Sequence, residues 1–161
     1  MPASPVVALA LRDAVAAALN DPVGVLGLAT PGWSQTVEAE TCYAPDLELK
    51  DLADLRVLVA ARARRQSLLT RGSSQVDLDV AVGVFKQVGN DPDNPDGFDQ
   101  DEVAALLLLC QEFEEALFRF RVASPQFQVF EVTGDPIYDP EMLATQRRFE
   151  AVIVLSFRGS R

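Results

Sequence analysis

Two stretches of strict alternation decide the fold: Val76-Asp77-Leu78-Asp79-Val80-Ala81-Val82-Gly83-Val84 and Phe149-Glu150-Ala151-Val152-Ile153-Val154-Leu155-Ser156-Phe157. Side chains on a β-strand point to opposite faces with a period of two, so each stretch predicts a strand with one apolar row. The first stretch carries acids and small residues on its other face, as expected for a sheet with one wetted side. The second is apolar on both faces through Val152 and Val154, so we expect both of its sides to be covered.

Length and composition indicate an ordinary globular chain. The sequence has 161 residues, of which 48% are hydrophobic and 24% charged. We therefore expect one domain, residues 1–161, that buries roughly two-thirds of the surface its unfolded chain exposes. No signal peptide is apparent, and the longest uncharged apolar stretch, 103–110, is far below the ~20 residues that a membrane span needs. We expect Cys42 and Cys110 to be unpaired core residues.

Charge and the missing histidine narrow the function classes. The formal net charge is -10, which argues against a surface that grips phosphate backbones. An acidic surface would still let DNA pass nearby without adhering. The chain has no histidine, so it lacks the commonest general base and the commonest metal ligand, which argues against most hydrolase and metalloenzyme mechanisms; we expect no cofactor.

The remaining pattern predicts two helices and further strands. Ser4-Pro5 begins a helix that ends at Asn20-Asp21-Pro22. Asp99 caps an amphipathic helix whose apolar stripe runs to Phe120, with Arg119 and Arg121 in its last turn and Ser124-Pro125 as its end. Strands are predicted over 33–43, 56–69 and 127–132, with a short helical or turn-like crossing over 47–55 and a single turn over 141–145.

These elements predict an α+β fold. We expect a mainly antiparallel sheet with the two main helices packed on one face. The composition of Thr70-Arg71-Gly72-Ser73-Ser74 is typical of a turn, so the strand over 56–69 and the strand from Gln75 should form a long β-hairpin. On the first of these strands, Val57, Val59, Ala61 and Ala63 should share one face, and Arg56, Arg62 and Arg64 the other.

Two acidic groups fail as chemical sites. The loop over 89–100 carries four aspartates, but alignment with an EF-hand loop puts Pro92 and Val103 where carboxylates are required. We interpret it as a solvated loop and predict no metal site. Glu112, Glu114 and Glu115 could do acid–base work, but nothing in the sequence supplies a pocket or a partner, and we favour a polar helix face with Glu115 pairing Arg119.

One basic cluster stands out in this acidic chain. It lies on the predicted hairpin and consists of Arg62, Arg64, Arg65 and Arg71, with the adjacent leucines Leu68 and Leu69 near the tip. One interpretation is a wetted sheet face. The other is an arm that docks on an acidic surface of a neighbour, most simply another copy of the chain, because sheet tips rarely expose adjacent leucines without a partner.

Three segments resemble a known family. They are Leu52-Ala53-Asp54-Leu55-Arg56-Val57-Leu58-Val59; Thr70-Arg71-Gly72 with the strand that ends in Val84-Phe85-Lys86-Gln87-Val88; and Asp135-Pro136-Ile137-Tyr138-Asp139-Pro140-Glu141 through Arg147-Arg148-Phe149. Their pattern and order resemble the neck and tail-completion proteins of tailed bacteriophages, whose fold is like that of the siphophage tail terminator.

The resemblance implies a structural virion protein without enzymatic activity. Such a protein would form a hexameric ring that caps the tail tube or joins it to the head connector, with DNA passing through the lumen without specific binding. Its partners would be further copies of itself, the tail tube protein and the connector or adaptor proteins, in the virion neck and in the host cytoplasm during assembly. Two alternatives stay open: a non-virion cytoplasmic adaptor with the same fold, and a small carboxylate-dependent enzyme.

Overall fold

The computed structural model describes residues 5–21, 37–43, 53–118, 120–122, 126–134 and 137–160. Three helices and six strands lie in this part of the chain, which confirms the α+β class. The helices are α1 (Pro5–Asn20), α2 (Gln100–Leu117) and α3 (Pro140–Gln146). The strands are β1 (Ala39–Cys42), β2 (Arg56–Thr70), β3 (Ser73–Gln87), β4 (Arg121–Val122), β5 (Phe127–Thr133) and β6 (Arg148–Ser160).

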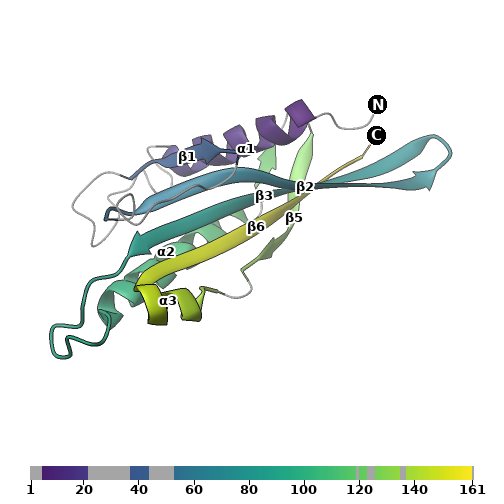
Figure 1. Ribbon diagram of the computed structural model, residues 1–161. Helices are drawn as coiled ribbons and strands as arrows, with labels where there is room; N and C mark the ends of the chain where they lie inside the picture. Colours follow the sequence, from purple (N-terminus) through teal and green to yellow (C-terminus); the bar gives the residue numbers. More distant parts are fainter. Residues whose placement is uncertain are drawn as a thin grey trace.

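The strands form one mixed sheet in the order β1-β2-β3-β6-β5-β4 (Figure 1). β1 pairs parallel with β2, and the other neighbours pair antiparallel. The two alternating stretches lie side by side in its centre, where Val80 pairs with Leu155 and Val82 with Ile153. Their apolar rows therefore form one continuous buried surface.

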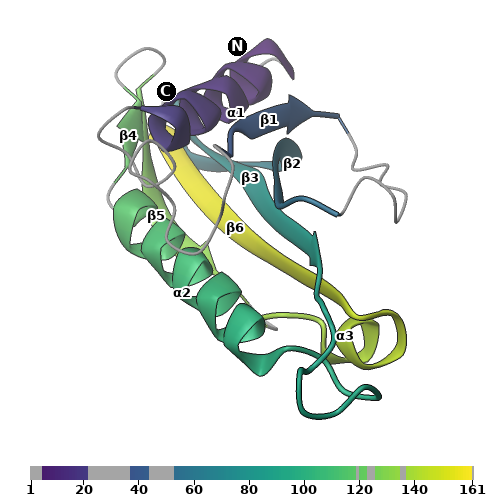
Figure 2. The same ribbon diagram turned by 90° about the vertical axis from the view of Figure 1, so that its left-hand side faces the viewer.

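Both main helices cover the same face of the sheet, as predicted (Figure 2). Leu11 and Val15 of α1 belong to the same buried cluster as Leu106 and Phe113 of α2. This cluster also takes in the inward rows of β3 and β6, including the fully buried Phe157. The opposite face, called the open face below, carries no helix of this cluster.

Aspartate caps fix where the second and third helices begin. The Asp99 carboxylate accepts hydrogen bonds from the backbone N–H groups of Asp101 and Glu102, as the sequence predicted. Asp139 does the same for α3 through Glu141 and Met142. These bonds satisfy N–H groups that have no partner within the helix.

Replacing Asp99 by alanine should therefore lower the free energy of unfolding by about 1 kcal/mol. Asp101→Ala is the matched control, because Asp101 caps nothing and acts only through the helix dipole, worth a few tenths of a kcal/mol. Urea denaturation of both variants measures the difference. Equal losses would contradict the capping role of Asp99.

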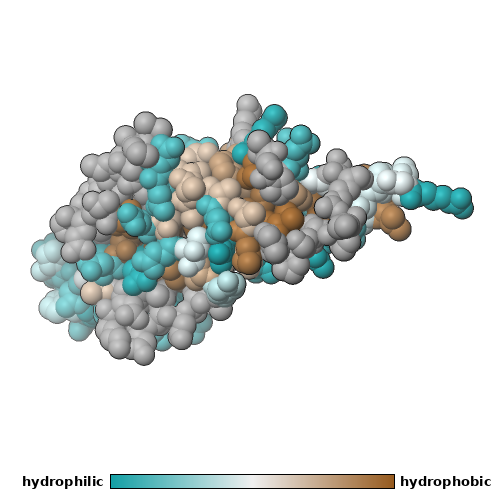
Figure 3. All heavy atoms as spheres, turned by 90° about the horizontal axis from the view of Figure 1, so that it is seen from above, coloured by the Kyte–Doolittle hydropathy of each residue, from teal (hydrophilic) through white to brown (hydrophobic). Residues whose placement is uncertain are grey.

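A long hairpin arm projects from the body of the sheet (Figure 1). β2 and β3 stay paired to the turn, with Gln66 opposite Val76 and Thr70 opposite Ser73, whereas β6 ends its pairing at Gln75. We call residues 66–76 the hairpin arm. The space-filling view shows its extremity as hydrophilic, with hydrophobic atoms close behind (Figure 3).

A β-bulge at Arg62 overturns the predicted faces of β2. The register shifts between Ala61, which pairs with Val80, and Ala63, which pairs with Asp79. One extra residue reverses the alternation beyond it. Ala63 therefore lies on the open face, away from Val57 and Val59, and Arg64, opposite the buried Leu78, lies on the helix-bearing face.

Other boundaries also differ from the prediction. α2 ends at Leu117, and Arg121 pairs with Gln128 in β4 instead of prolonging the helix. Phe120 leaves the helix to contact the Phe157 ring edge-on, with centroids 6.1 Å apart. The predicted strand over 33–43 is shorter, since Val37 and Glu38 precede β1, and its first part lies outside the described residues, as does most of the crossing over 47–55. The turn over 141–145 belongs to the longer α3.

Candidate functional site: the open face and the hairpin arm

The open face is built from rows of residues that pair across four strands. Directly paired residues share a face of the sheet, so the register alone places them. One row is Ala60, Ala81, Val154 and Thr133. The next, toward the arm, is Ala63, Asp79, Ser156 and Glu131. The third is Arg65, Asp77, Arg158 and Gln128.

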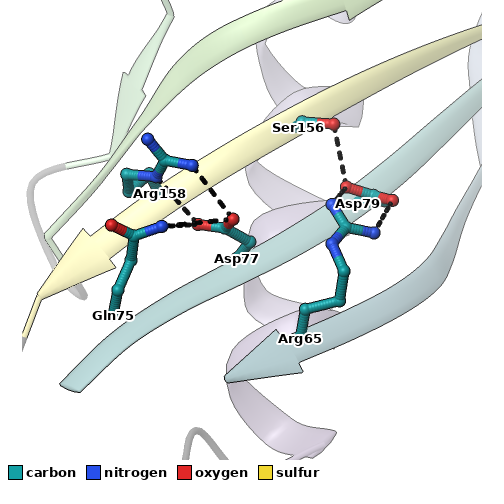
Figure 4. A network of polar contacts seen from close by, with 6 residues as sticks. All are labelled: Arg65, Gln75, Asp77, Asp79, Ser156 and Arg158. Atoms are coloured by element: carbon teal, nitrogen blue, oxygen red, sulfur yellow. Dashed lines mark hydrogen bonds and ion pairs between the residues drawn. The ribbon is translucent and has the colours of Figure 1, made fainter. Parts of the chain in front are cut away.

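Asp79 is the centre of a polar network at this face (Figure 4). Arg65 donates to its two carboxylate oxygens, Nη1 to Oδ2 at 2.8 Å and Nη2 to Oδ1 at 2.9 Å. Ser156 Oγ donates to Oδ1 at 2.9 Å. The network therefore ties β2, β3 and β6 together where the arm leaves the body.

A second pair lies one row closer to the arm. Arg158 donates from Nε and Nη2 to the Asp77 carboxylate at 3.0 and 3.1 Å, beside Gln75 (Figure 4). The same guanidinium lies over the Phe130 ring, 4.0 Å from its centroid. Bidentate pairs of this kind hold the side chains in one geometry, so the root of the arm is fixed on the open face.

These contacts shift the pKa values of the network. Burial raises the pKa of Asp79, but the hydrogen bonds from Arg65 and Ser156, together with the positive charges of Arg65 and Arg62, hold it below its ordinary value overall. The hydrogen bond to Asp79 raises the pKa of Arg65, and the hydrogen bond to Asp77 raises that of Arg158. Both arginines are therefore charged across the physiological pH range.

The open face is hollowed into a trough of about 1050 Å³. Small side chains form much of its floor, namely Ala60, Ala63, Ala81, Val152, Val154 and Ser156. Val152 is 36% exposed, so the described residues leave this part of β6 open, whereas Ser156 further along the same face is buried. The expectation that both faces of β6 are covered is thus met on the helix side and only in part on the open face.

The walls of the open-face trough differ in charge. Arg62 and Arg65 line it from β2, and three acids line it from β5, α3 and β6: Glu131, Asp139 and Glu150. Asp139 caps α3 and Glu150 is paired with Arg148. Glu131 is exposed and makes no ion pair with the described residues. The wall opposite β2 is therefore acidic.

The residues predicted as an interface divide into two groups. Leu68, Leu69 and Arg71 lie on the hairpin arm, where Leu68 is 82% and Leu69 57% exposed. Arg62 and Arg65 instead line the trough, and Arg64 lies on the helix-bearing face. The structure thus places only the first group at the tip, and the six residues do not form one patch.

Arg65 also has an internal role that the sequence did not reveal. Its partner Asp79 has only an 11% exposed side chain. Reversing the charge at Arg65 would place two carboxylates together and strain the fold itself. A test of the arm as an interface should therefore change Arg71 and the leucines.

The other chemical candidates stay dispersed. Glu115 accepts a hydrogen bond from Gln111, and its proposed partner Arg119 lies outside the described residues. Within the described ranges, no group of three or more metal-ligating side chains gathers, and no helix is long and apolar enough to span a membrane. Cys110 is buried and unpaired, and burial raises the pKa of its thiol to about 12, while Cys42 is half-buried and also unpaired.

The trough itself was missed by the sequence analysis. Its floor is assembled from residues of four strands that no local pattern connects. Val152 and Val154 were the one available signal, because they make β6 apolar on its second face. The sequence matches no protein-family model and no curated protein.

Proposed function

We propose that this chain is a structural protein of a tailed-phage virion that forms a ring at the neck, hexameric as in the family that it resembles. It would cap the tail tube and join it to the head connector, and DNA would pass through the lumen. The observation that carries the proposal is the pair of unlike surfaces on one subunit. An arm with exposed leucines projects from one end, and an uncovered, partly apolar trough lies on the open face.

Symmetry connects this observation to a ring. When two different surfaces of one chain bind each other, the contact is head-to-tail, and it closes into a ring or continues as a filament. The α+β fold, the long hairpin and the two main helices on one face agree with a terminator-like subunit. We include in the proposal that the sheet is the mainly antiparallel sheet of such a subunit.

The net charge supports a lumen through which DNA can move. At -10 per subunit, a ring would present a strongly acidic surface. Such a surface repels the phosphate backbone and leaves the polymer able to slide. The same charge makes the subunits repel one another, so the ring should form most readily on its target.

Assembly should therefore respond to salt. We expect monomers at low ionic strength and association as salt rises, because the Debye length falls from ~30 Å at 0.01 M to ~10 Å at 0.1 M and screens the repulsion between subunits. Sedimentation velocity across this range measures the change. A chain that stays monomeric at high salt and high concentration, and also fails to join purified tails, would contradict the proposal.

Membership of the virion gives the decisive test. Mass spectrometry of purified particles should find about six copies per particle, the number of a single closed ring. A non-virion adaptor with the same fold would be absent from particles. Turnover of a substrate that is lost in Glu114→Gln would instead favour the carboxylate-dependent enzyme.

A further inference from the structure

We propose that the arm tip of one copy, Leu68, Leu69 and Arg71, inserts into the open-face trough of the next copy. The leucines would lie on the floor near Val152 and Val154, and Arg71 would face Glu131. This inference deepens the proposed function and rests on it for the assembly in which the contact occurs. It names the receiving surface, which the arm alone does not identify.

Chemical complementarity is the first argument. The tip offers two exposed leucines and an exposed arginine within four residues. The trough offers an apolar floor with Val152 36% exposed, and an acidic wall that includes Glu131, which makes no ion pair with the described residues. Burying apolar surface contributes roughly 25 cal/mol per Å², and an opposed charge pair sets the register of the contact.

The direction of the arm indicates that the trough binds the arm of a second copy of the chain. The arm is a paired hairpin whose root is fixed by the Asp79 and Asp77 networks, and it extends away from the body (Figures 1 and 4). It therefore cannot fold back onto its own trough without breaking those pairs. The hollow of about 1050 Å³ is large enough to receive the two leucine side chains of such a tip.

Cross-linking between two variants that each carry one introduced cysteine tests the contact. In a Cys42→Ser background, Leu68→Cys and Val152→Cys proteins are mixed at high concentration and elevated salt, and treated with a short bismaleimide. Cys110 can remain, because burial raises the pKa of its thiol to about 12 and leaves it unreactive at neutral pH. A covalent heterodimer is expected. Leu108→Cys, exposed on α2, replaces Leu68→Cys in the control and should give none.

Charge exchange gives a second, independent measurement. Arg71→Glu should weaken association at least about tenfold, and adding Glu131→Arg to it should restore most of the loss. Glu141→Arg, at an exposed acid of α3 that does not line the trough, should not restore it. Thermal melting should be unchanged by Arg71→Glu, since an exposed arginine contributes little to the stability of the subunit.

The outcomes separate this inference from the proposed function. Absence of the Leu68–Val152 cross-link, or equal behaviour of Glu131→Arg and Glu141→Arg, would overturn the contact, even if about six copies are found in each particle. A cross-link in a protein that is absent from virions would keep the contact and overturn the proposed function. A cross-link in a protein that purified virions contain in about six copies would support both the contact and the proposed function.

Discussion

Replacing Phe157 by alanine should lower the free energy of unfolding by about 3–5 kcal/mol. Phe157 is fully buried in the central strand β6 and meets the Phe120 ring edge-on. Its removal would leave a cavity between the sheet and the end of α2, where the segments around it are held by the sheet and cannot collapse fully. Because native domains are stable by only about 5–15 kcal/mol, this single change would remove much of the total.

Urea denaturation measures this loss, and Phe118→Ala is the matched control. Phe118 is 56% exposed at the end of α2, so the same chemical change there should cost far less. Thermal melting should fall by roughly 10 °C for Phe157→Ala, at about 2–4 °C per kcal/mol for a chain of this size. Equal losses in the two variants would show that Phe157 is not a core residue.

Replacing Asp79 by asparagine should have the next largest effect, about 1–2 kcal/mol at neutral pH. Hydrogen bonds to a charged group contribute about 1.5–3 kcal/mol, and we lower this range because the Arg65 side chain is 54% exposed to screening solvent. The change removes the charge that Arg65 and Ser156 surround. The arm would then lose part of its attachment to the body.

The effect should depend on pH in a definite direction. The pKa of Asp79 is lower in the folded than in the unfolded chain, so its contribution is complete above the unfolded value of about 3.9 and is lost as the pH falls through the folded value. The stability difference between the native chain and Asp79→Asn should therefore shrink on acidification. Asp96→Asn, on the exposed acidic loop, is the control and should show little difference at any pH. If the stability difference between the native chain and Asp79→Asn instead grew as the pH fell, the lowered pKa assigned to Asp79 would be wrong.

The strands that carry long alternation could be predicted from sequence, and the reason is physical. In β3 and β6 every second residue is committed to the core, so a one-residue slip would expose the whole apolar row. The capped start of α2 was predicted for a similar reason, because Asp99 satisfies N–H groups within its own neighbourhood. In these places local chemistry and tertiary structure agree.

The remaining features depend on contacts distant in sequence. The bulge at Arg62 is set by pairing with Asp79 and Val80, and α2 ends early because Phe120 packs on Phe157. Arg65 could be recognised as basic, but its partner Asp79 could not be identified before the register was known. The trough exists only once four strands are in register, so its acidic wall and apolar floor had no local signature.

The outer edge of β2 has a consequence for solubility. β1 covers this edge only between Val57 and Ala60, and beyond Ala60 no described strand pairs with it. An uncovered edge offers backbone groups to any other strand and is a route to aggregation. Arginines at 62, 64 and 65 follow this edge, and their charges oppose the stacking of identical edges. The arginines predicted as part of an interface therefore also oppose edge-to-edge misassembly of the chain.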